Sequence, residues 1–154
     1  MDKKIEKLKN FRLYLLHHIN ELTTEQLNKI PGGYNNNIVW NMAHLICVQQ
    51  TLCNVRSGLP ILVEDKYFTP YMPGTKPGAF VNDDEIETIK KLFISTIDSL
   101  QNDLDKKIFQ NYTASVMIPK VYGFEVNNMD DALEYLLYHE GFHGGCISSL
   151  KHLV

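Results

Sequence analysis

The sequence predicts an all-α fold, a four-helix bundle with long crossover loops. Apolar residues recur at steps of three and four in four long segments, which is the period of a helix that buries one side. Asparagine stands at the start of three of these segments, where its side chain can cap a helix. Two stretches that contain proline and glycine, residues 59–81 and 106–127, are long enough to cross the bundle between helices.

The first half of the chain is expected to hold two of the long helices. The first runs over about residues 3–21, and a short turn at TTEQL follows, in which Thr24 is the expected cap. The second long helix is expected from its cap Asn37 to Ser57, with Gly58 as the stop signal. The expected inward positions of these two helices are Ile5, Leu8, Leu15, Ile19, Leu22, Ile38, Met42, Leu45, Val48, Leu52 and Val55.

The second half is expected to hold the other two long helices. The third starts after Asn82, which together with Glu85 resembles a capping box. The fourth starts after Asn128 and carries Asp130 and Asp131 in its first turn, where negative charge interacts favourably with the helix dipole. The expected inward positions are Ile86, Ile89, Phe93, Ile97, Leu100 and Leu104 in the third helix and Ala132, Leu136, His139, His143, Cys146, Leu150 and Leu153 in the fourth.

The two long connections allow different interpretations. Residues 59–81 contain four prolines and several aromatic residues, and they form either a lid or binding loop or a stiff crossover. Residues 106–127 contain YTASVMI and VYGFEV on either side of Pro119, a pattern that predicts a small β-hairpin.

Composition narrows the class of protein. The 154 residues, of which 44% are apolar, predict one domain over residues 1–154, and the net charge of −3 argues against nucleic-acid binding. The sequence has neither a secretory signal nor an apolar stretch long enough to span a membrane. Three dispersed cysteines without a CxxC pattern argue against a disulfide framework, and a cytoplasmic location is expected.

The histidines carry the chemical signal. His139 and His143 are four residues apart, so on a helix their side chains stand about 6 Å apart along the axis on nearly the same face. Both occupy inward positions, where burying a polar ring costs about 1–3 kcal/mol unless a partner satisfies it. A metal ion would be such a partner, and His44 in the second helix is the candidate third ligand. The alternative is a pair of core histidines that bond to tyrosine or to the backbone.

Other residues have weaker claims on a metal site. HEGFH also matches the HExxH pattern of zinc proteases, in which Glu140 would act as the general base, but little chain remains for a distal third ligand. Cys47 and Cys146 each follow a candidate ligand by three residues, and they either approach the metal or fill the core. The remaining histidines lie toward helix ends and are expected at the surface: His17, His18 and His152.

The segments VWNMAHL, in the second helix, and HEGFHGG, in the last, resemble the DinB-like superfamily (DinB/YfiT) of small metal-binding four-helix bundles. The resemblance covers nearly the whole length and includes the turn LNKIPGGYNNN before the second helix. It implies that His44, His139 and His143 hold a divalent metal ion, nickel or zinc, and that the chain forms a homodimer. The sequence departs from the common His-Arg-Gly-Gln ending, because Gly144 and Gly145 follow the last histidine.

The expected function follows from three neutral imidazoles, which leave a position on the metal open, as in catalytic sites. We expect a metal-dependent hydrolase, or a transferase that uses a low-molecular-weight thiol, acting on a small molecule between the bundle and residues 59–81. The alternative is a non-enzymatic metal-binding or stress-response protein with a structural or vestigial site. Glu140 and Tyr138 are acid–base candidates, although both lie off the histidine face, so the catalytic residue stays unknown.

Overall fold

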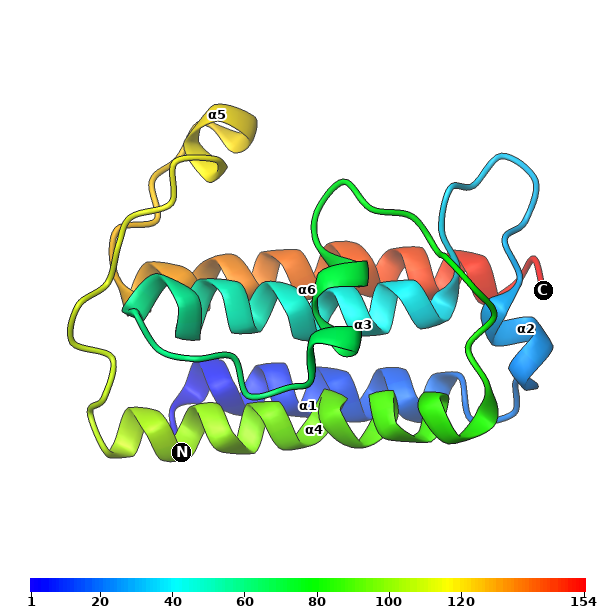
Figure 1. The fold of residues 1–154 in the computed structure, drawn as a ribbon, viewed down its shortest axis with the longest axis horizontal. Helices are drawn as coiled ribbons and strands as arrows, with labels where there is room; N and C mark the ends of the chain where they lie inside the picture. The colour runs from blue at the N-terminus through cyan, green and yellow to red at the C-terminus, as the bar shows by residue number, and fades with distance from the viewer.

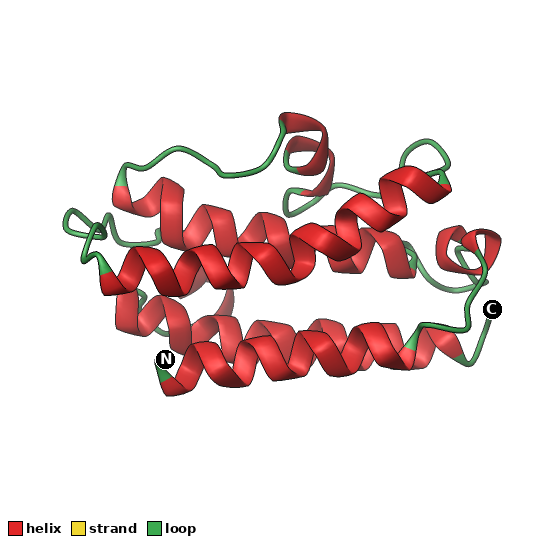
Figure 2. Cartoon of the chain, turned by 90° about the horizontal axis from the view of Figure 1, so that it is seen from below, coloured by secondary structure: helices red, strands yellow, loops and turns green.

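Four long helices lie side by side and form a bundle (Figure 1). The computed structural model describes residues 1–154 and contains helices and loops only (Figure 2). The long helices are α1 (Lys3–His18), α3 (Ile38–Gln49), α4 (Asp83–Asp105) and α6 (Met129–Lys151). Both α1 and α3 pack against α4 and against α6. The predicted all-α bundle with long crossover loops is therefore confirmed.

Asparagine caps start three of the helices, as the sequence predicted. Asn37, Asn82 and Asn128 each accept a hydrogen bond from the backbone N–H three residues further on. The short helix α2 (Thr24–Asn28) is capped by Thr23, one residue before the predicted cap. Thr23 is the better cap because the glutamine three positions on returns a hydrogen bond to its N–H and completes a capping box.

The second predicted helix does reach Ser57, but its last turns are not α-helical. A π-helical turn, η1 (Gln50–Asn54), follows α3, and a 3₁₀ turn, η2 (Val55–Ser57), follows η1. Gly58 then ends the helix in the left-handed region, with φ at 71°. Because the π turn holds more residues than an α turn, it rotates the side chains after it, and Val55, predicted to face inward, is 48% exposed.

The predicted inward positions of α6 are correct along most of the helix. Ala132, Leu136 and Leu150 are buried, as are the two histidines. Cys146 is only partly buried, and Leu153, which lies beyond the helix end, is 46% exposed. A repeated 4–3 spacing assumes 3.5 residues per turn, so positions drift by about 20° per heptad on a straight α-helix, and the prediction fails toward the end.

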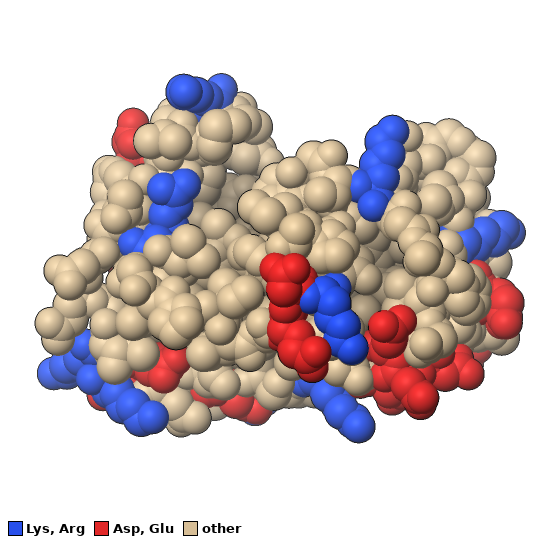
Figure 3. Space-filling view, viewed as in Figure 1, with Lys and Arg blue, Asp and Glu red and all other residues tan.

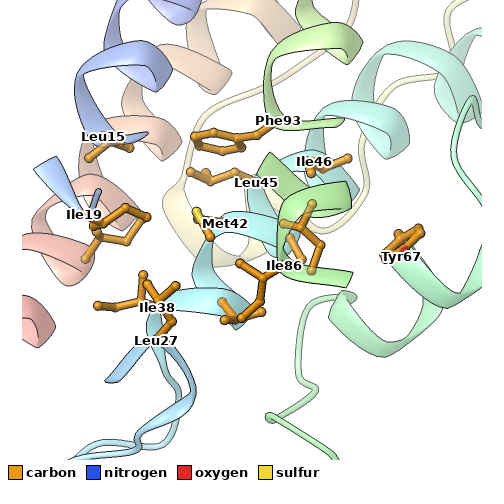
Figure 4. Packing of buried hydrophobic residues seen from close by; sticks show 14 of the residues in the cluster. Leu15, Ile19, Leu27, Ile38, Met42, Leu45, Ile46, Tyr67, Ile86 and Phe93 are labelled. Atoms are coloured by element: carbon orange, nitrogen blue, oxygen red, sulfur yellow. The ribbon is translucent and has the colours of Figure 1, made fainter. Parts of the chain in front are cut away.

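The crossover formed by residues 59–81 runs past α3 and carries the short turns η3 (Asp65–Tyr67) and η4 (Thr69–Tyr71) (Figure 1). Tyr67 is buried and belongs to the same apolar cluster as Ile86 of α4 (Figure 4). The side chain of Tyr71 also packs against that cluster. The segment is thus a packed crossover, anchored by its own aromatic residues.

The β-hairpin predicted within residues 106–127 is wrong. The segment contains the short helix α5 (Ile118–Tyr122), which stands away from the bundle in Figure 1. Pro119 fits the first turn of a helix, and Gly123 ends it in the left-handed region, with φ at 76°. The segments on either side of Pro119 therefore form this short helix and two loop arms, which are joined by a backbone hydrogen bond from Ser115 to Val126.

Two apolar clusters fill the bundle and leave a polar layer between them. One cluster gathers residues near the C-terminal end of α1 and the start of α3, and Figure 4 shows its packing around Met42, Leu45 and Phe93. The other lies around the N-terminal end of α1 and the first turns of α6. Arg12 of α1 is fully buried between them, on the apolar stripe between Leu8 and Leu15. None of the helices combines the length and the hydropathy that a membrane span requires.

Candidate metal centre

Three histidines from two helices meet inside the bundle. His44 lies in the middle of α3, while His139 and His143 lie one turn apart in the middle of α6. One ring nitrogen from each lies within 4.8 Å of the others. The three side chains are 5–7% exposed. The structure thus brings together the three residues that the sequence singled out.

The rings surround a common point at similar angles. The ring centroids of His44 and His139 are 5.2 Å apart, those of His44 and His143 are 4.7 Å apart, and those of His139 and His143 are 4.5 Å apart. Each pair of ring planes is tilted by 50–53°. The three rings are therefore not stacked on one another, and ring nitrogens of all three can turn toward one atom.

His44 is fixed by its own helix and by the crossover. Its Nδ1 lies 2.7 Å from the backbone oxygen of Tyr71 in η4. Because a carbonyl oxygen only accepts, Nδ1 carries the proton, and the free electron pair is on Nε2. Trp40, one turn earlier, stacks on the ring at 4.5 Å with an interplanar angle of 11°. Both contacts orient His44 with Nε2 available to a metal.

The side-chain amide of Asn41 fixes His143 in the same tautomer as His44. Its Nδ1 lies 2.8 Å from Oδ1 of Asn41 on α3. The amide nitrogen of Asn41 donates to the backbone oxygen of Asn37 and to the side-chain oxygen of Asn36, and this assigns Oδ1 as the atom that faces His143. Nδ1 of His143 is therefore the donor, and its Nε2 keeps a free electron pair.

His139 is the ring with an unsatisfied atom. Its Nδ1 is buried and has no hydrogen-bond partner, although Tyr135 stacks on the ring with centroids 5.5 Å apart. A buried polar group without a partner costs about 1–3 kcal/mol. A metal ion bound to the cluster would fix the orientation of this ring, so the residues present fit such an ion.

Burial keeps all three histidines neutral. Loss of hydration, with a smaller effect of the neighbouring histidines, lowers the pKa of His139 to about 2 and that of His143 to about 3. Burial also lowers the pKa of His44, against the hydrogen bond to Tyr71. Neutral imidazole is the form that binds metals, so the cluster has no proton to lose when an ion enters.

A comparison with known families identifies the fold. The sequence model of the DinB superfamily matches residues 7–147, a range that includes all three histidines. The chain belongs to the DinB superfamily. No curated protein and no solved structure matches its sequence.

Glu140 has a different role in this DinB-superfamily chain from the general base of a zinc protease. Its Oε1 accepts hydrogen bonds from Nε of Arg12 at 2.8 Å and from Nη2 at 2.5 Å. Burial raises the pKa of Glu140, while the Arg12 guanidinium lowers it. Because two N–H donors of a buried cation converge on this carboxyl group, Glu140 forms a buried ion pair on the side of α6 that faces α1.

The ion pair belongs to a wider polar network across all four long helices. Arg12 also donates to Gln49 of α3 and to Thr96 of α4, at 3.1 and 3.3 Å. Its Nη1 and Nη2 also donate to the backbone oxygens of Phe93 and Leu45, respectively. Sequence reasoning missed this network, although Arg12, four positions after Leu8 and three before Leu15, stands on the buried stripe of α1.

The two cysteines near the candidate ligands are not part of the cluster, which contains histidines only. Burial raises the pKa of Cys47 to about 11, so its thiol stays protonated at neutral pH. Burial also raises the pKa of Cys146. Of the two interpretations of these residues, the structure supports core and boundary packing.

Gly144 packs closely against α1, where an added side chain would displace the ring of Phe11. A Cβ atom added there would lie 2.7 Å from Cε1 of Phe11, closer than a side chain tolerates. The same addition at Gly145 meets nothing within 4 Å. Of these two glycines, the first therefore packs closely against another helix and the second does not.

Proposed function

We propose that this DinB-superfamily protein is a divalent-metal-dependent enzyme that acts on a small molecule, as a hydrolase or as a thiol-dependent transferase. The observation that carries the proposal is the convergence of three neutral, oriented imidazoles from α3 and α6. Three protein ligands are the usual number in a catalytic zinc site, which keeps a position for water or substrate. Nitrogen donors of this kind suit zinc and nickel.

A divalent ion held by three imidazoles lowers the pKa of a bound water or thiol and so supplies a nucleophile at neutral pH. The chain itself supplies orientation. Tyr71 and Asn41 hold the Nδ1 protons of His44 and His143, so that both rings present Nε2. Such partners typically change metal affinity or activity by 10- to 100-fold when they are removed.

The acid–base candidates from the sequence do not serve this site. Glu140 is engaged by Arg12, and the side chain of Tyr138 is 54% exposed and contacts Tyr122 and Tyr135. Because neither group is free to move a proton at the cluster, the proposal favours a nucleophile that needs no separate protein base. A low-molecular-weight thiol, which ionises readily on a metal, meets this requirement better than an alcohol does.

One observation favours the non-enzymatic alternative. The three histidines are only 5–7% exposed, which leaves a substrate little direct access. In that case the bound ion contributes its binding energy to folding, and the site is a structural clip.

A homodimer, a cytoplasmic location and the absence of nucleic-acid partners stay predictions. On the face shown in Figure 3, acidic and basic side chains are interspersed.

Metal content tests the proposal directly. Protein purified without a histidine tag and without added metal should contain about one zinc or nickel ion per chain by elemental analysis. His44→Ala, His139→Ala and His143→Ala should each lose that ion, whereas His152→Ala, which changes an exposed histidine, should keep it. Wild-type protein that holds no stoichiometric metal, and binds none in titration, refutes the proposal.

A second measurement separates the enzyme from the clip. Cobalt-substituted protein should develop a thiolate-to-metal absorption band when a small thiol is added, because an open position accepts the sulfur ligand. A clip gives no such band, and removal of its metal lowers the melting temperature by several degrees. Circular dichroism of each histidine variant establishes that it is folded.

A further inference from the structure

A small cavity lies beside the candidate metal centre, between the start of α3 and the crossover. Its volume is about 190 Å³. It is lined by Asn37, Val39, Trp40, Pro70, Tyr71, Pro77, Gly78, Ala79, Phe80, Val81 and Glu85. Pockets for drug-sized ligands are typically about 300–1,000 Å³. This cavity therefore suits a ligand, or part of one, of only a few heavy atoms.

Aromatic side chains form much of its wall. One face of the Trp40 ring stacks on His44, and the indole N–H donates to Thr75 at 3.1 Å. These contacts hold the ring in place where it lines the cavity. Tyr71 is held through its backbone oxygen, which accepts from His44. Phe80 is 60% exposed and stands at the cavity without being part of the core.

The charge of the lining is one-sided. Glu85 is its only acidic residue, and no lysine, arginine or histidine lines the cavity. The Glu85 side chain takes part in none of the ion pairs and makes no hydrogen bond. The backbone N–H of Glu85 donates to the cap Asn82. Lys66 interacts electrostatically with Glu85 but pairs with Glu64, so the Glu85 carboxylate has no direct ion-pair partner. A cation would complete this lining.

We propose that the cavity lined by Trp40, Tyr71, Phe80 and Glu85 binds a small organic cation, an alkylated ammonium group. The faces of aromatic rings attract such a group, tryptophan most strongly, and a carboxylate adds direct charge complementarity. The methyl groups of the ammonium ligand suit the prolines and Val81 of the lining. A strongly hydrated metal cation would not find enough oxygen ligands among these apolar residues. The site does not depend on a metal at the histidines.

The only tryptophan of the chain is Trp40, so its fluorescence reports on the cavity. Titration with tetramethylammonium and with choline should change the emission with saturation at millimolar concentrations, in metal-free and metal-loaded protein alike. 3,3-Dimethyl-1-butanol, which has the shape of choline without its charge, should bind about tenfold more weakly or worse. Ligand-observed NMR measures binding independently of the fluorescence change.

Variants assign the binding to the proposed residues. Glu85→Gln keeps the backbone cap and removes the charge, and it should weaken choline binding by about tenfold. Asp84→Asn removes the same charge one residue earlier, outside the cavity lining, and should change binding by less than about twofold. Phe80→Leu should weaken binding by about threefold, whereas Phe124→Leu, in a remote loop, should not.

Two results would overturn the proposal. Equal binding of choline and its uncharged analogue would mean that the cavity recognises apolar shape alone. Absence of saturable binding by both fluorescence and NMR would mean that the cavity takes no ammonium ligand. Either result leaves the metal content of the histidine site unaffected, so failure here is distinguishable from failure of the proposed function.

Discussion

The buried ion pair between Arg12 and Glu140 makes a quantitative prediction about stability. The side chains are 0% and 2% exposed, and Arg12 is the one cation in the polar layer. Glu140→Leu leaves the guanidinium buried without its counter-ion, and Arg12→Met leaves the carboxylate in the same position. Breaking a buried pair from one side costs about 3–5 kcal/mol, so each single variant should lose that much of the free energy of unfolding.

The double variant should lose much less than the sum of these losses. With both charges gone, the remaining cost comes from the acceptors that Arg12 no longer serves, chiefly Gln49 and two backbone oxygens. A lost hydrogen bond costs about 1 kcal/mol, and Gln49 keeps its bond from Thr96, so the double variant should lose about 2–3 kcal/mol. The single losses add to about 6–10 kcal/mol, which makes the coupling energy at least about 3 kcal/mol.

Urea-induced unfolding at pH 7, followed by circular dichroism, measures all four proteins. The denaturation midpoints should fall in both single variants and recover in part in the double variant, with slopes that stay similar. Additive losses would refute the reasoning, because they would mean that the two charges do not depend on each other. Glu140→Gln, which keeps an oxygen acceptor for Arg12, should lie between wild type and Glu140→Leu.

Three further predictions concern the histidines and the helix contact. Asn41→Leu should weaken metal binding by about 10- to 100-fold in competition with a chromophoric chelator, whereas Asn41→Asp, which keeps an acceptor for the His143 proton but loses the N–H donors to Asn36 and Asn37, should bind more tightly than Asn41→Leu. Metal-free protein should lose stability as the pH falls from 7 to 5, because the unfolded chain binds protons below pH 6.5 while the three buried histidines stay neutral. His139 and His143 each account for about 2 kcal/mol of this loss at pH 5, and His143→Gln should remove the share of one histidine. A pH dependence that is the same in wild type and variant contradicts the assigned neutral state. Gly144→Ala should lower the free energy of unfolding by about 1–3 kcal/mol, because the added methyl group clashes with Phe11. Gly145→Ala, in open space, should raise the free energy of unfolding by up to about 1 kcal/mol. Equal effects of the two variants in urea unfolding would show that the close contact is not formed.

Much of the bundle could be predicted because helix periodicity and capping are local properties. The three asparagine caps and most inward positions of α6 follow from residues within a few turns of each other. The hairpin prediction failed for a local reason too. Pro119 fits the first turn of a helix and Gly123 ends it, so the apolar residues around them form a short helix and no strand pair.

The candidate site was only half accessible from the sequence. The spacing of His139 and His143 indicates a shared face, and His44 in the second helix is the candidate third ligand, which the resemblance to the family supports. Asn41 carried no signal, because an asparagine in a helix is common and its partner lies 102 residues away. Arg12 carries no signal either, because a charged residue is normally expected at the surface, and only the partners from three other helices make its burial tolerable.

The bond from His44 to the backbone oxygen of Tyr71 has a consequence for how this protein tolerates change. A main-chain acceptor is present whatever residue occupies position 71, so no substitution there deletes it chemically. Only a shift in the path of the chain can release the imidazole. Sequence change in the crossover is therefore constrained more by the length and path of the chain than by which residues it contains. An insertion or deletion between η3 and η4 should disturb the histidine cluster more than most point mutations in the same segment.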